Sequence, residues 1–174
     1  ANDAVLPAVN PHQTVPLPTY RANLHEMIQT LKSLPTPPRI LLITPPPVDA
    51  HRWGTRTKPA DQPPAVADRE FAYTKQYRDV CIDVGKDERV PVVDTWPLFL
   101  GDSLAFDAGV LQDILSDGLH LAAEGNKRLG KAVLDLVLLE WPDLDPEAMP
   151  SVLPWHGDVD KTAIPETFFG RVRG

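Results

Sequence analysis

The sequence is poor in cysteine, in long apolar runs and in dense basic stretches, and each deficit excludes a class of protein. With Cys81 as the single cysteine in 174 residues, an intrachain disulfide is impossible, which favours a reducing compartment and predicts a cytoplasmic protein. The apolar runs are far shorter than the roughly 20 residues that a membrane-spanning helix needs. The formal net charge is -7, without a dense Lys/Arg run, which argues against nucleic acid as a partner.

The first residues contain neither an initiator methionine nor a signal peptide. The chain opens on Ala1-Asn2-Asp3-Ala4, which is not a basic segment followed by an apolar one. We therefore expect the natural N-terminus to lie upstream or to have been processed away, together with any targeting signal.

What the sequence does contain is the composition and periodicity of a globular domain. Hydrophobic residues make up 43% and charged residues 24% of the chain, as in an ordinary folded protein. After a proline-punctuated loop over 1–19, apolar residues at three- and four-residue spacing predict a helix from about Tyr20, which Pro35 ends. The apolar run over 40–43 predicts a short parallel strand that is buried on both faces.

The same alternation continues along the chain. The expected elements are a polar loop over 49–64, a helix over 66–84 with Gly85 as its C-cap, a strand over 90–93, a short helix and loop over 97–116, and a helix over 123–141. Glycine is the usual residue just past a helix end. Helices that alternate with short apolar strands predict an α/β domain with a parallel sheet.

The last segment differs in character from the rest. From Pro142 onward prolines are frequent and periodic apolar residues are scarce, which predicts an extension without regular structure. Trp155, Phe168 and Phe169 are candidates for anchoring it, so a packed extension is favoured over a disordered one. We therefore divide the chain into a domain over 1–141 and a C-terminal extension, packed on that domain, over 142–174.

The segment Ser116-Asp117-Gly118-Leu119-His120-Leu121 is the part of the sequence most indicative of chemistry. It lies between a strand unit and a helix start, where α/β sheets carry functional loops. A carboxylate three residues before a histidine can fold back onto the ring, fix its tautomer and leave the other nitrogen free as a base. Taken alone, however, such a pattern more often marks a turn begun by Asp117, with His120 as a helix-entry residue.

The wider context of this segment resembles a known family. The run D-G-L-H-L, followed by Glu124-Gly125-Asn126 and an amphipathic helix, resembles the last conserved block of the SGNH (GDSL-type) hydrolases. Residues 10–32 and 40–47 resemble the fourth-strand region of isoamyl acetate-hydrolysing esterases, and 93–96 resembles their fifth strand. The resemblance covers residues 1–141 with order and spacing kept. It implies the three-layer, flavodoxin-like α/β fold, of which this chain supplies the C-terminal strands and helices.

The resemblance also implies a function and a site. In these esterases a serine attacks an ester carbonyl, a histidine takes its proton and an aspartate orients the histidine, without a metal or organic cofactor. Matched residue by residue, His120 is the expected base and later acid, Asp117 its orienting partner, and Asn2, in the tail of the family's G-x-N-D block, an oxyanion donor. Without the resemblance, Asn2 is better explained as a turn residue. The implied substrates are short-chain acyl esters, acetates especially.

The chain departs from the family in lacking its nucleophile block. The family's G-D-S-L block and a glycine block both precede the G-x-N-D block, so we expect both upstream of Ala1. Ser103 stands in a Gly-Asp-Ser-Leu run, but it follows the fifth-strand match, which is the wrong order for a nucleophile, and we treat it as a coincidence. We therefore expect the isolated chain to be inactive and marginally stable, with an N-terminal fragment of the same protein as a candidate partner.

Two other functions stay open at this level. A truncated, catalytically inactive relative would act as a binding or interaction module, and the missing serine block favours that alternative for the chain taken alone. A nucleotide-binding flavodoxin-like module is less favoured, because no glycine-rich phosphate loop follows either expected strand. A metal site is not expected, because no two histidines have a convincing ligand spacing and a single cysteine excludes a thiolate cluster.

Overall fold

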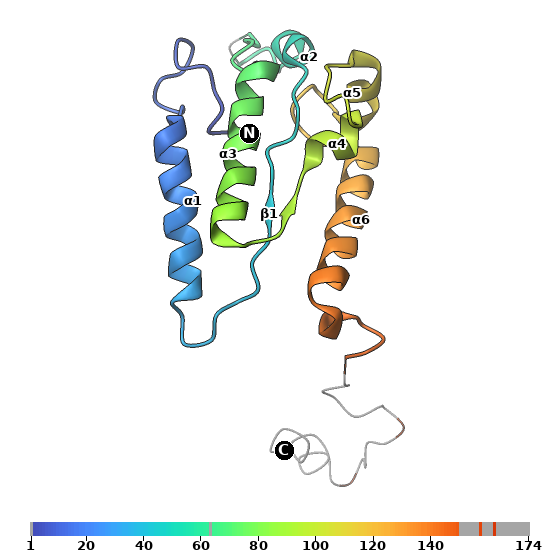
Figure 1. Ribbon diagram of the computed structural model, residues 1–174. Coiled ribbons are helices and arrows are strands. Elements are labelled where there is room, and N and C mark those ends of the chain that lie inside the picture. Colours follow the sequence, from blue (N-terminus) through green and yellow to red (C-terminus); the bar gives the residue numbers. More distant parts are fainter. Residues whose placement is uncertain (1, 63, 150–156, 158–161, 163–174) are drawn as a thin grey trace. The chain divides into compact units, whose positions relative to one another are not determined.

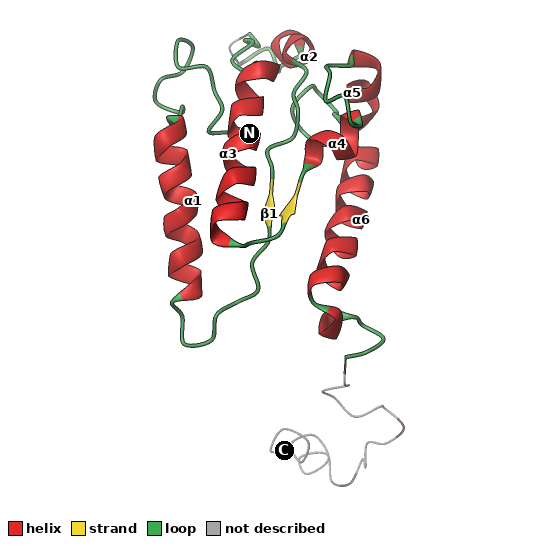
Figure 2. Cartoon of the chain, viewed as in Figure 1, coloured by secondary structure: helices red, strands yellow, loops and turns green. Residues whose placement is uncertain are grey.

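The computed structural model describes residues 2–62, 64–149, 157 and 162. The chain divides into a first compact unit, Ala1–Leu136, and a second, Val137–Gly174. In the first unit, helices lie on both sides of a short parallel sheet (Figures 1 and 2). The α/β class expected from the sequence is therefore confirmed.

The sheet consists of β1 (Leu42–Ile43) and β2 (Val92–Val93), which pair in parallel. The expectation that the first strand is buried on both faces is wrong, because Ile43 is 45% exposed. Just beyond the two strands, the backbone N–H of Thr95 donates to Thr44 Oγ1 at 2.9 Å, and both threonines are buried. A buried hydrogen bond therefore joins the two segments that follow the strands. This carboxyl edge of the sheet is where α/β folds place their functional loops.

Two long helices, α1 (Leu17–Lys32) and α3 (Phe71–Glu88), cover one face of the sheet (Figure 1). Pro18 lies in the first turn of α1, where its missing N–H breaks no helical hydrogen bond, so the helix begins before the expected start at Tyr20. The core between these helices and the strands is formed by Leu24, Ile28, Ile40, Leu42, Val80, Val84 and Val90. This core buries only part of the apolar periodicity of α1, because Met27 and Leu31 of the same helix stay exposed.

The other side of the sheet carries α4 (Thr95–Leu100), α5 (Ala108–Ile114) and the first turns of α6 (Ala123–Glu140). Their shared core is formed by Leu98, Phe99, Leu100, Val110, Leu111, Ile114, Leu115, Leu121 and Leu129. The prediction of α6 is confirmed. The segment expected to hold one short helix holds two, because the carboxylates of Asp94 and Asp107 each cap the start of one.

The limits expected for the second long helix are wrong at both ends. The helix α3 begins at Phe71, not near Val66, and it continues to a C-cap at Arg89, which has a left-handed backbone with φ 54°. Gly85, the expected C-cap, is buried inside the helix. A Cβ at Gly85 would overlap the side chain of Val92 in β2. This glycine therefore allows the helix to approach the sheet closely and does not end the helix.

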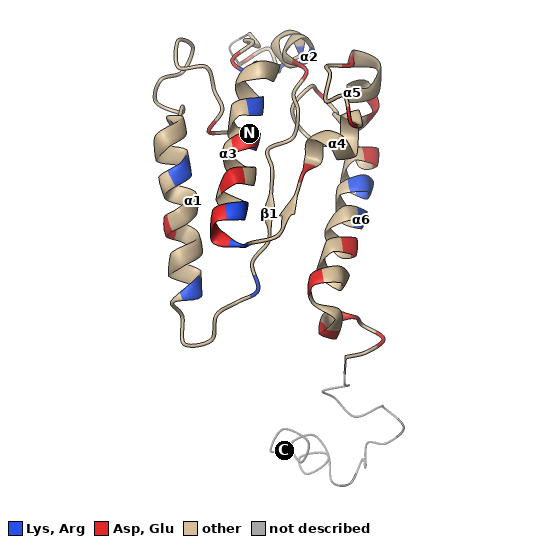
Figure 3. Cartoon of the chain, viewed as in Figure 1, with Lys and Arg blue, Asp and Glu red and all other residues tan. Residues whose placement is uncertain are grey.

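Glu88, the last residue of α3, joins this helix to α1. Its carboxylate accepts hydrogen bonds from Lys32 Nζ at 2.8 Å and from Gln29 Nε2, and it contacts His25 Nδ1 at 2.7 Å. Charges of opposite sign also lie along the facing parts of the two helices (Figure 3). The hydrogen bonds from Lys32 and His25 lower the pKa of Glu88 from 4.5 to about 2. The ionised carboxylate therefore stabilises the pairing of α1 with α3.

Thermal stability is expected to decrease as the pH falls from about 4.5 to about 2. A carboxyl group whose pKa is lower in the folded state stabilises that state above the unfolded pKa, and the contribution is lost as the pH falls through the folded pKa. Glu88→Gln cannot ionise, so it should flatten this part of the stability profile. Unfolding temperatures of both proteins across this range are the measurement, and parallel profiles would contradict the role of Glu88.

In the second unit the structure describes residues 137–149, 157 and 162. After α6 the chain forms a 3₁₀ turn, η1 (Pro142–Leu144). The anchors expected for the C-terminal extension, Trp155, Phe168 and Phe169, lie outside the described residues, so the packing of this extension stays a prediction. Among the residues that the structure describes, no helix is both long and apolar enough to cross a membrane.

Candidate active site

Residues 116–121, called here the Asp-His turn, lie against a short helix, α2 (Ala50–Thr55). Asp49 caps this helix by accepting a hydrogen bond from the backbone N–H of Arg52 at 3.0 Å. The backbone N–H of Asp49 donates to the carbonyl oxygen of Gly118 at 2.8 Å. Gly118 has φ 94°, and a Cβ there would lie 2.5 Å from the carbonyl oxygen of Asp49. Glycine at this position therefore allows the turn to rest directly on the helix.

Asp117 organises the Asp-His turn through both carboxylate oxygens. Oδ1 accepts hydrogen bonds from the backbone N–H groups of Leu119 at 3.0 Å and of His120 at 2.9 Å. Oδ2 lies 2.7 Å from Nδ1 of the His120 ring. The contact expected from the spacing of the two residues is therefore confirmed. From this geometry we infer the tautomer with the proton on Nδ1, which leaves Nε2 as the acceptor.

The base of the Asp-His turn is closed by antiparallel backbone contacts. The N–H of Ser116 donates to the carbonyl oxygen of His120 at 2.8 Å, and the N–H of Ala122 donates to that of Ile114 at 2.8 Å. Leu115 and Leu121 form an isolated antiparallel bridge between these bonds. The turn is thus held at both ends before α6 begins.

The environment of the pair suits a carboxylate beside a protonatable ring. Burial alone would raise the pKa of Asp117, but hydrogen bonds from the backbone and ring of His120 and from the backbone of Leu119 bring it below the ordinary value of 3.8. Asp117 is therefore ionised at neutral pH and can stabilise an imidazolium. The side chain of His120 is 68% exposed, against 29% for Asp117. The ring is open to a reacting group while its partner is shielded.

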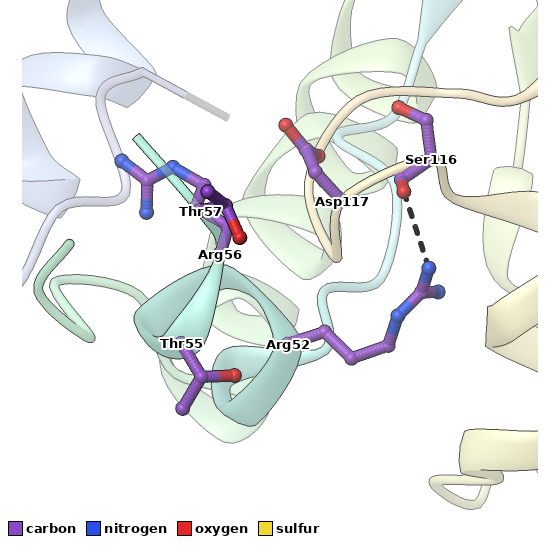
Figure 4. A pocket seen from close by; sticks show the side chains of 6 residues that line it. All are labelled: Arg52, Thr55, Arg56, Thr57, Ser116 and Asp117. Atoms are coloured by element: carbon purple, nitrogen blue, oxygen red, sulfur yellow. Dashed lines mark hydrogen bonds between the residues drawn. The ribbon is translucent and has the colours of Figure 1, made fainter. Parts of the chain in front are cut away.

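Arg52 fastens α2 to the start of the Asp-His turn. Its guanidinium donates to the main-chain oxygens of Leu115 at 3.0 Å, of Ser116 at 3.1 Å and, more weakly, of Gln112 at 3.4 Å. Figure 4 shows the bond to Ser116. Beside it lies an open pocket of ≈ 410 Å³, lined by Arg52, Thr55, Arg56, Thr57, Ser116 and Asp117. Asp117 therefore borders a polar pocket with cationic side chains.

Asn2 belongs to a segment that backbone hydrogen bonds tie to the same region. The N–H of Leu6 donates to the carbonyl oxygen of Asp68 at 2.8 Å, and the Asp68 side chain accepts a hydrogen bond from Trp53 of α2 at 2.6 Å. Asn2 itself is exposed. Within the described part of the chain it makes no hydrogen bond to the Asp-His turn, so its role as an oxyanion donor stays a prediction.

Ser103 lies on an exposed turn after α4 and not at the end of a strand. Its Oγ accepts a hydrogen bond from the backbone N–H of Ala105 at 3.3 Å, and no hydrogen bond joins it to His120 among the described residues. The expected surface loop is confirmed. Over the same described residues, no three His, Cys, Asp or Glu side chains gather as metal ligands do.

The loop expected over 49–64 is wrong in its first part, because Ala50–Thr55 forms α2, and the support that this helix gives to the Asp-His turn was not predicted. The helix has only six residues, too few for an apolar periodicity to emerge, and prolines precede and follow it in the sequence. One signal was available, because an aspartate three residues before Arg52 is the pattern of an N-cap. The contacts of Arg52 and Trp53 with distant segments had no counterpart in the local sequence.

The chain is similar in sequence to a known family of hydrolases and to curated members of it. The GDSL-like Lipase/Acylhydrolase family matches residues 1–128. The chain is 36% identical over 167 residues to the isoamyl acetate-hydrolyzing esterase 1 homolog of Mus musculus, a match that covers 95% of this chain and 61% of the mouse protein. The homolog of Rattus norvegicus is 36% identical over 165 residues, with 93% and 60% covered.

A solved structure agrees with these matches. The lipase/acylhydrolase from Enterococcus faecalis is 25% identical and superimposes with a TM-score of 0.58, over 80% of this chain and 57% of that one. The chain spans about 60% of the length of the curated relatives described above. It belongs to the GDSL-like lipase/acylhydrolase family.

Proposed function

We propose that this chain supplies the Asp-His part of an ester hydrolase site of the Ser-His-Asp type. The observation that carries the proposal is the 2.7 Å contact between Asp117 Oδ2 and His120 Nδ1 on an exposed turn. A general base needs such a partner, because the carboxylate fixes the ring and stabilises the imidazolium while the other nitrogen accepts a proton.

In the proposed reaction, His120 Nε2 takes the proton of a serine hydroxyl while the serine oxygen attacks the ester carbonyl, and it returns that proton to the leaving alcohol. Asp117 stays ionised throughout, and Asn2 donates its side-chain amide to the oxyanion. Water then hydrolyses the acyl-enzyme with His120 again as the base. The names of the rodent relatives support short-chain acyl esters, acetates especially, as the substrates.

None of the serines near the Asp-His turn is assigned as the nucleophile. The hydroxyl of Ser116 donates to the main-chain oxygen of His120 at 3.1 Å, and Ser103 lies on a separate exposed turn. In the family the serine block precedes the block that Asn2 matches. We therefore expect the nucleophile to come from sequence before Asn2, on the same chain or on an N-terminal fragment, and we expect residues 1–174 alone to be inactive.

Hydrolysis of p-nitrophenyl acetate and isoamyl acetate by the natural full-length protein tests this function. A fluorophosphonate should abolish the activity and label a serine that precedes Asn2, which peptide mass spectrometry can locate. Residues 1–174 assayed in parallel should show neither hydrolysis nor labelling. A full-length protein that is folded but neither hydrolyses acetates nor reacts with the probe would favour the binding-module alternative.

Asp117→Asn is expected to lower kcat by roughly 10²- to 10⁴-fold with little change in fold. The asparagine oxygen can still accept the two backbone hydrogen bonds that Asp117 Oδ1 accepts. Its amide, however, presents a donor to Nδ1 of His120, which favours the wrong tautomer and gives no charge to stabilise the imidazolium. Steady-state kinetics and thermal unfolding of the variant measure the two effects. A variant with unchanged kcat would remove Asp117 from the proposed machinery.

A further inference from the structure

We propose that Trp53 is a positioning residue that holds the His120 ring in its working orientation. The centroids of the two rings lie 5.6 Å apart with an interplanar angle of 71°, which is the geometry of an edge-on aromatic contact. The consequence for catalysis rests on the esterase function proposed above. The contact itself stands on the described coordinates of α2 and the Asp-His turn.

The His120 ring needs such a support because little else restrains it. It is 68% exposed, and exposed side chains change rotamer within nanoseconds. Its hydrogen bond to Asp117 involves Nδ1, so the ring can swing about that contact and carry Nε2 away from a substrate. A rigid side chain packed against the ring limits this rotation, and Trp53 provides that packing contact.

Trp53 is itself held on several sides. It is 8% exposed and packs with Val48 and Leu119. Its Nε1–H donates to Asp68 Oδ1 at 2.6 Å, and the guanidinium carbon of Arg56 lies 3.1 Å from the centroid of its ring. The indole is therefore held by several contacts of its own, which the exposed imidazole of His120 lacks.

The anchor of Trp53 is fixed in turn by neighbouring segments. The carboxylate of Asp68 pairs with Arg69 at 2.8 Å, and Arg69 is 3% exposed. The next residue after Trp53, Gly54, lies so close to Ala67 that a Cβ on it would stand 2.8 Å from the Cβ of Ala67. The helix α2 thus has no room to slide along the segment that carries Asp68, and the indole stays in place beside His120.

Replacing Trp53 in the full-length protein separates a positioning role from a structural one. Trp53→Leu is expected to lower kcat by roughly 10- to 100-fold, because a small misplacement of a catalytic group has that effect, while KM changes by less than about threefold. Trp53→Phe keeps an aromatic ring beside His120 but lacks the N–H, so its kcat should be close to that of the wild type. Trp53→Met, whose longer and more flexible side chain adapts better to an irregular space, replaces the leucine variant if that one does not fold.

A spectroscopic readout makes the test independent of activity. In protein labelled with ¹⁵N-histidine, the ring signals of His120, assigned with His120→Gln, should report one tautomer with the proton on Nδ1. A ring without the support of Trp53 swings further, and the larger swing breaks its Nδ1 hydrogen bond to Asp117 for part of the time. Trp53→Leu should therefore shift these signals toward an average of the two tautomers, and Trp53→Phe should leave them near the wild-type positions.

Trp96→Phe is the matched control. Trp96 is fully buried, and its Nε1–H donates to the carbonyl oxygen of Pro45 at 2.9 Å, so the variant loses the same kind of bond without a contact to His120. It should lower the thermal stability and leave both kcat and the His120 signals unchanged.

The outcomes are distinct. Unchanged kcat and unchanged His120 signals in Trp53→Leu would overturn the positioning role. So would a phenylalanine variant that behaves like the leucine variant, because the anchor bond and not the ring would then matter. Should the wild-type protein lack esterase activity while Trp53→Leu still shifts the His120 signals, the proposed function fails and the positioning of the ring stands.

Discussion

His120→Ala in the natural full-length protein is expected to lower kcat/KM for acetate esters by roughly 10⁴- to 10⁶-fold. Without the imidazole, the serine hydroxyl keeps its proton at neutral pH, and the ionised Asp117 has no ring to orient. The rate that remains comes from substrate binding and the oxyanion donors. Because the ring is 68% exposed, its loss should leave the fold intact, which circular dichroism can verify alongside the steady-state kinetics.

Ser103→Ala is the matched control for this experiment. Ser103 stands in a sequence that imitates a nucleophile block, yet it lies on an exposed turn with its hydroxyl turned to the N–H of Ala105. The variant should keep kcat/KM within about twofold. Loss of activity in Ser103→Ala, or probe labelling at Ser103, would overturn the assignment of the nucleophile. A His120→Ala protein within about tenfold of wild type would instead remove the general base.

Gly118→Ala is expected to destabilise the folded state by about 2–6 kcal/mol, the sum of backbone strain and overpacking. Gly118 has φ 94°, where a side chain is disfavoured. Its Cβ would also stand 2.5 Å from the carbonyl oxygen of Asp49 and 2.6 Å from the nitrogen of Trp53. Both are backbone atoms of the α2 region, so relief requires the helix to move. Denaturant unfolding measures the loss, and activity should fall with it.

Alanine substitutions at two other glycines separate the contribution of backbone strain from that of overpacking. Gly101 has φ 71° but open space around it, so Gly101→Ala should show the strain alone, about 1–3 kcal/mol. Gly130 lies in α6 with ordinary φ and open space, so alanine there should stabilise by about 0.5–1 kcal/mol. Equal losses at positions 118 and 101 would show that the turn does not rest tightly on α2.

The local sequence could predict those helices and strands that are determined by residues close together in the chain. The helix α6 and the two short apolar strands carry their signal within a few residues, and their places in the sequence agree with the structure. The pairing of Asp117 with His120 is predictable for the same reason, because the two residues share one turn. Spacing alone brings the carboxylate back to the ring.

What the sequence could not show depends on partners far along the chain. Gly85 looks like a helix terminator until Val92 is seen to occupy the space beside it. Trp53 gives no local sign that it packs against His120 or that Asp68 holds its indole. These contacts join segments that only the tertiary structure brings together, and they decide the surroundings of the site.

The hydrogen bonds from the Arg52 guanidinium to main-chain oxygens, called here the Arg52 clamp, limit which substitutions the contact between α2 and the Asp-His turn tolerates. All of its acceptors near the Asp-His turn are main-chain oxygens, those of Gln112, Leu115 and Ser116. A carbonyl oxygen is present whatever the side chain, so substitution at those three positions leaves the clamp its acceptors. The constraint falls on position 52 alone, where lysine, with a single compact ammonium, cannot reproduce the forked set of donors. The contact therefore places its own sequence requirement on one arginine, while Leu115 remains constrained by the apolar core in which it is buried.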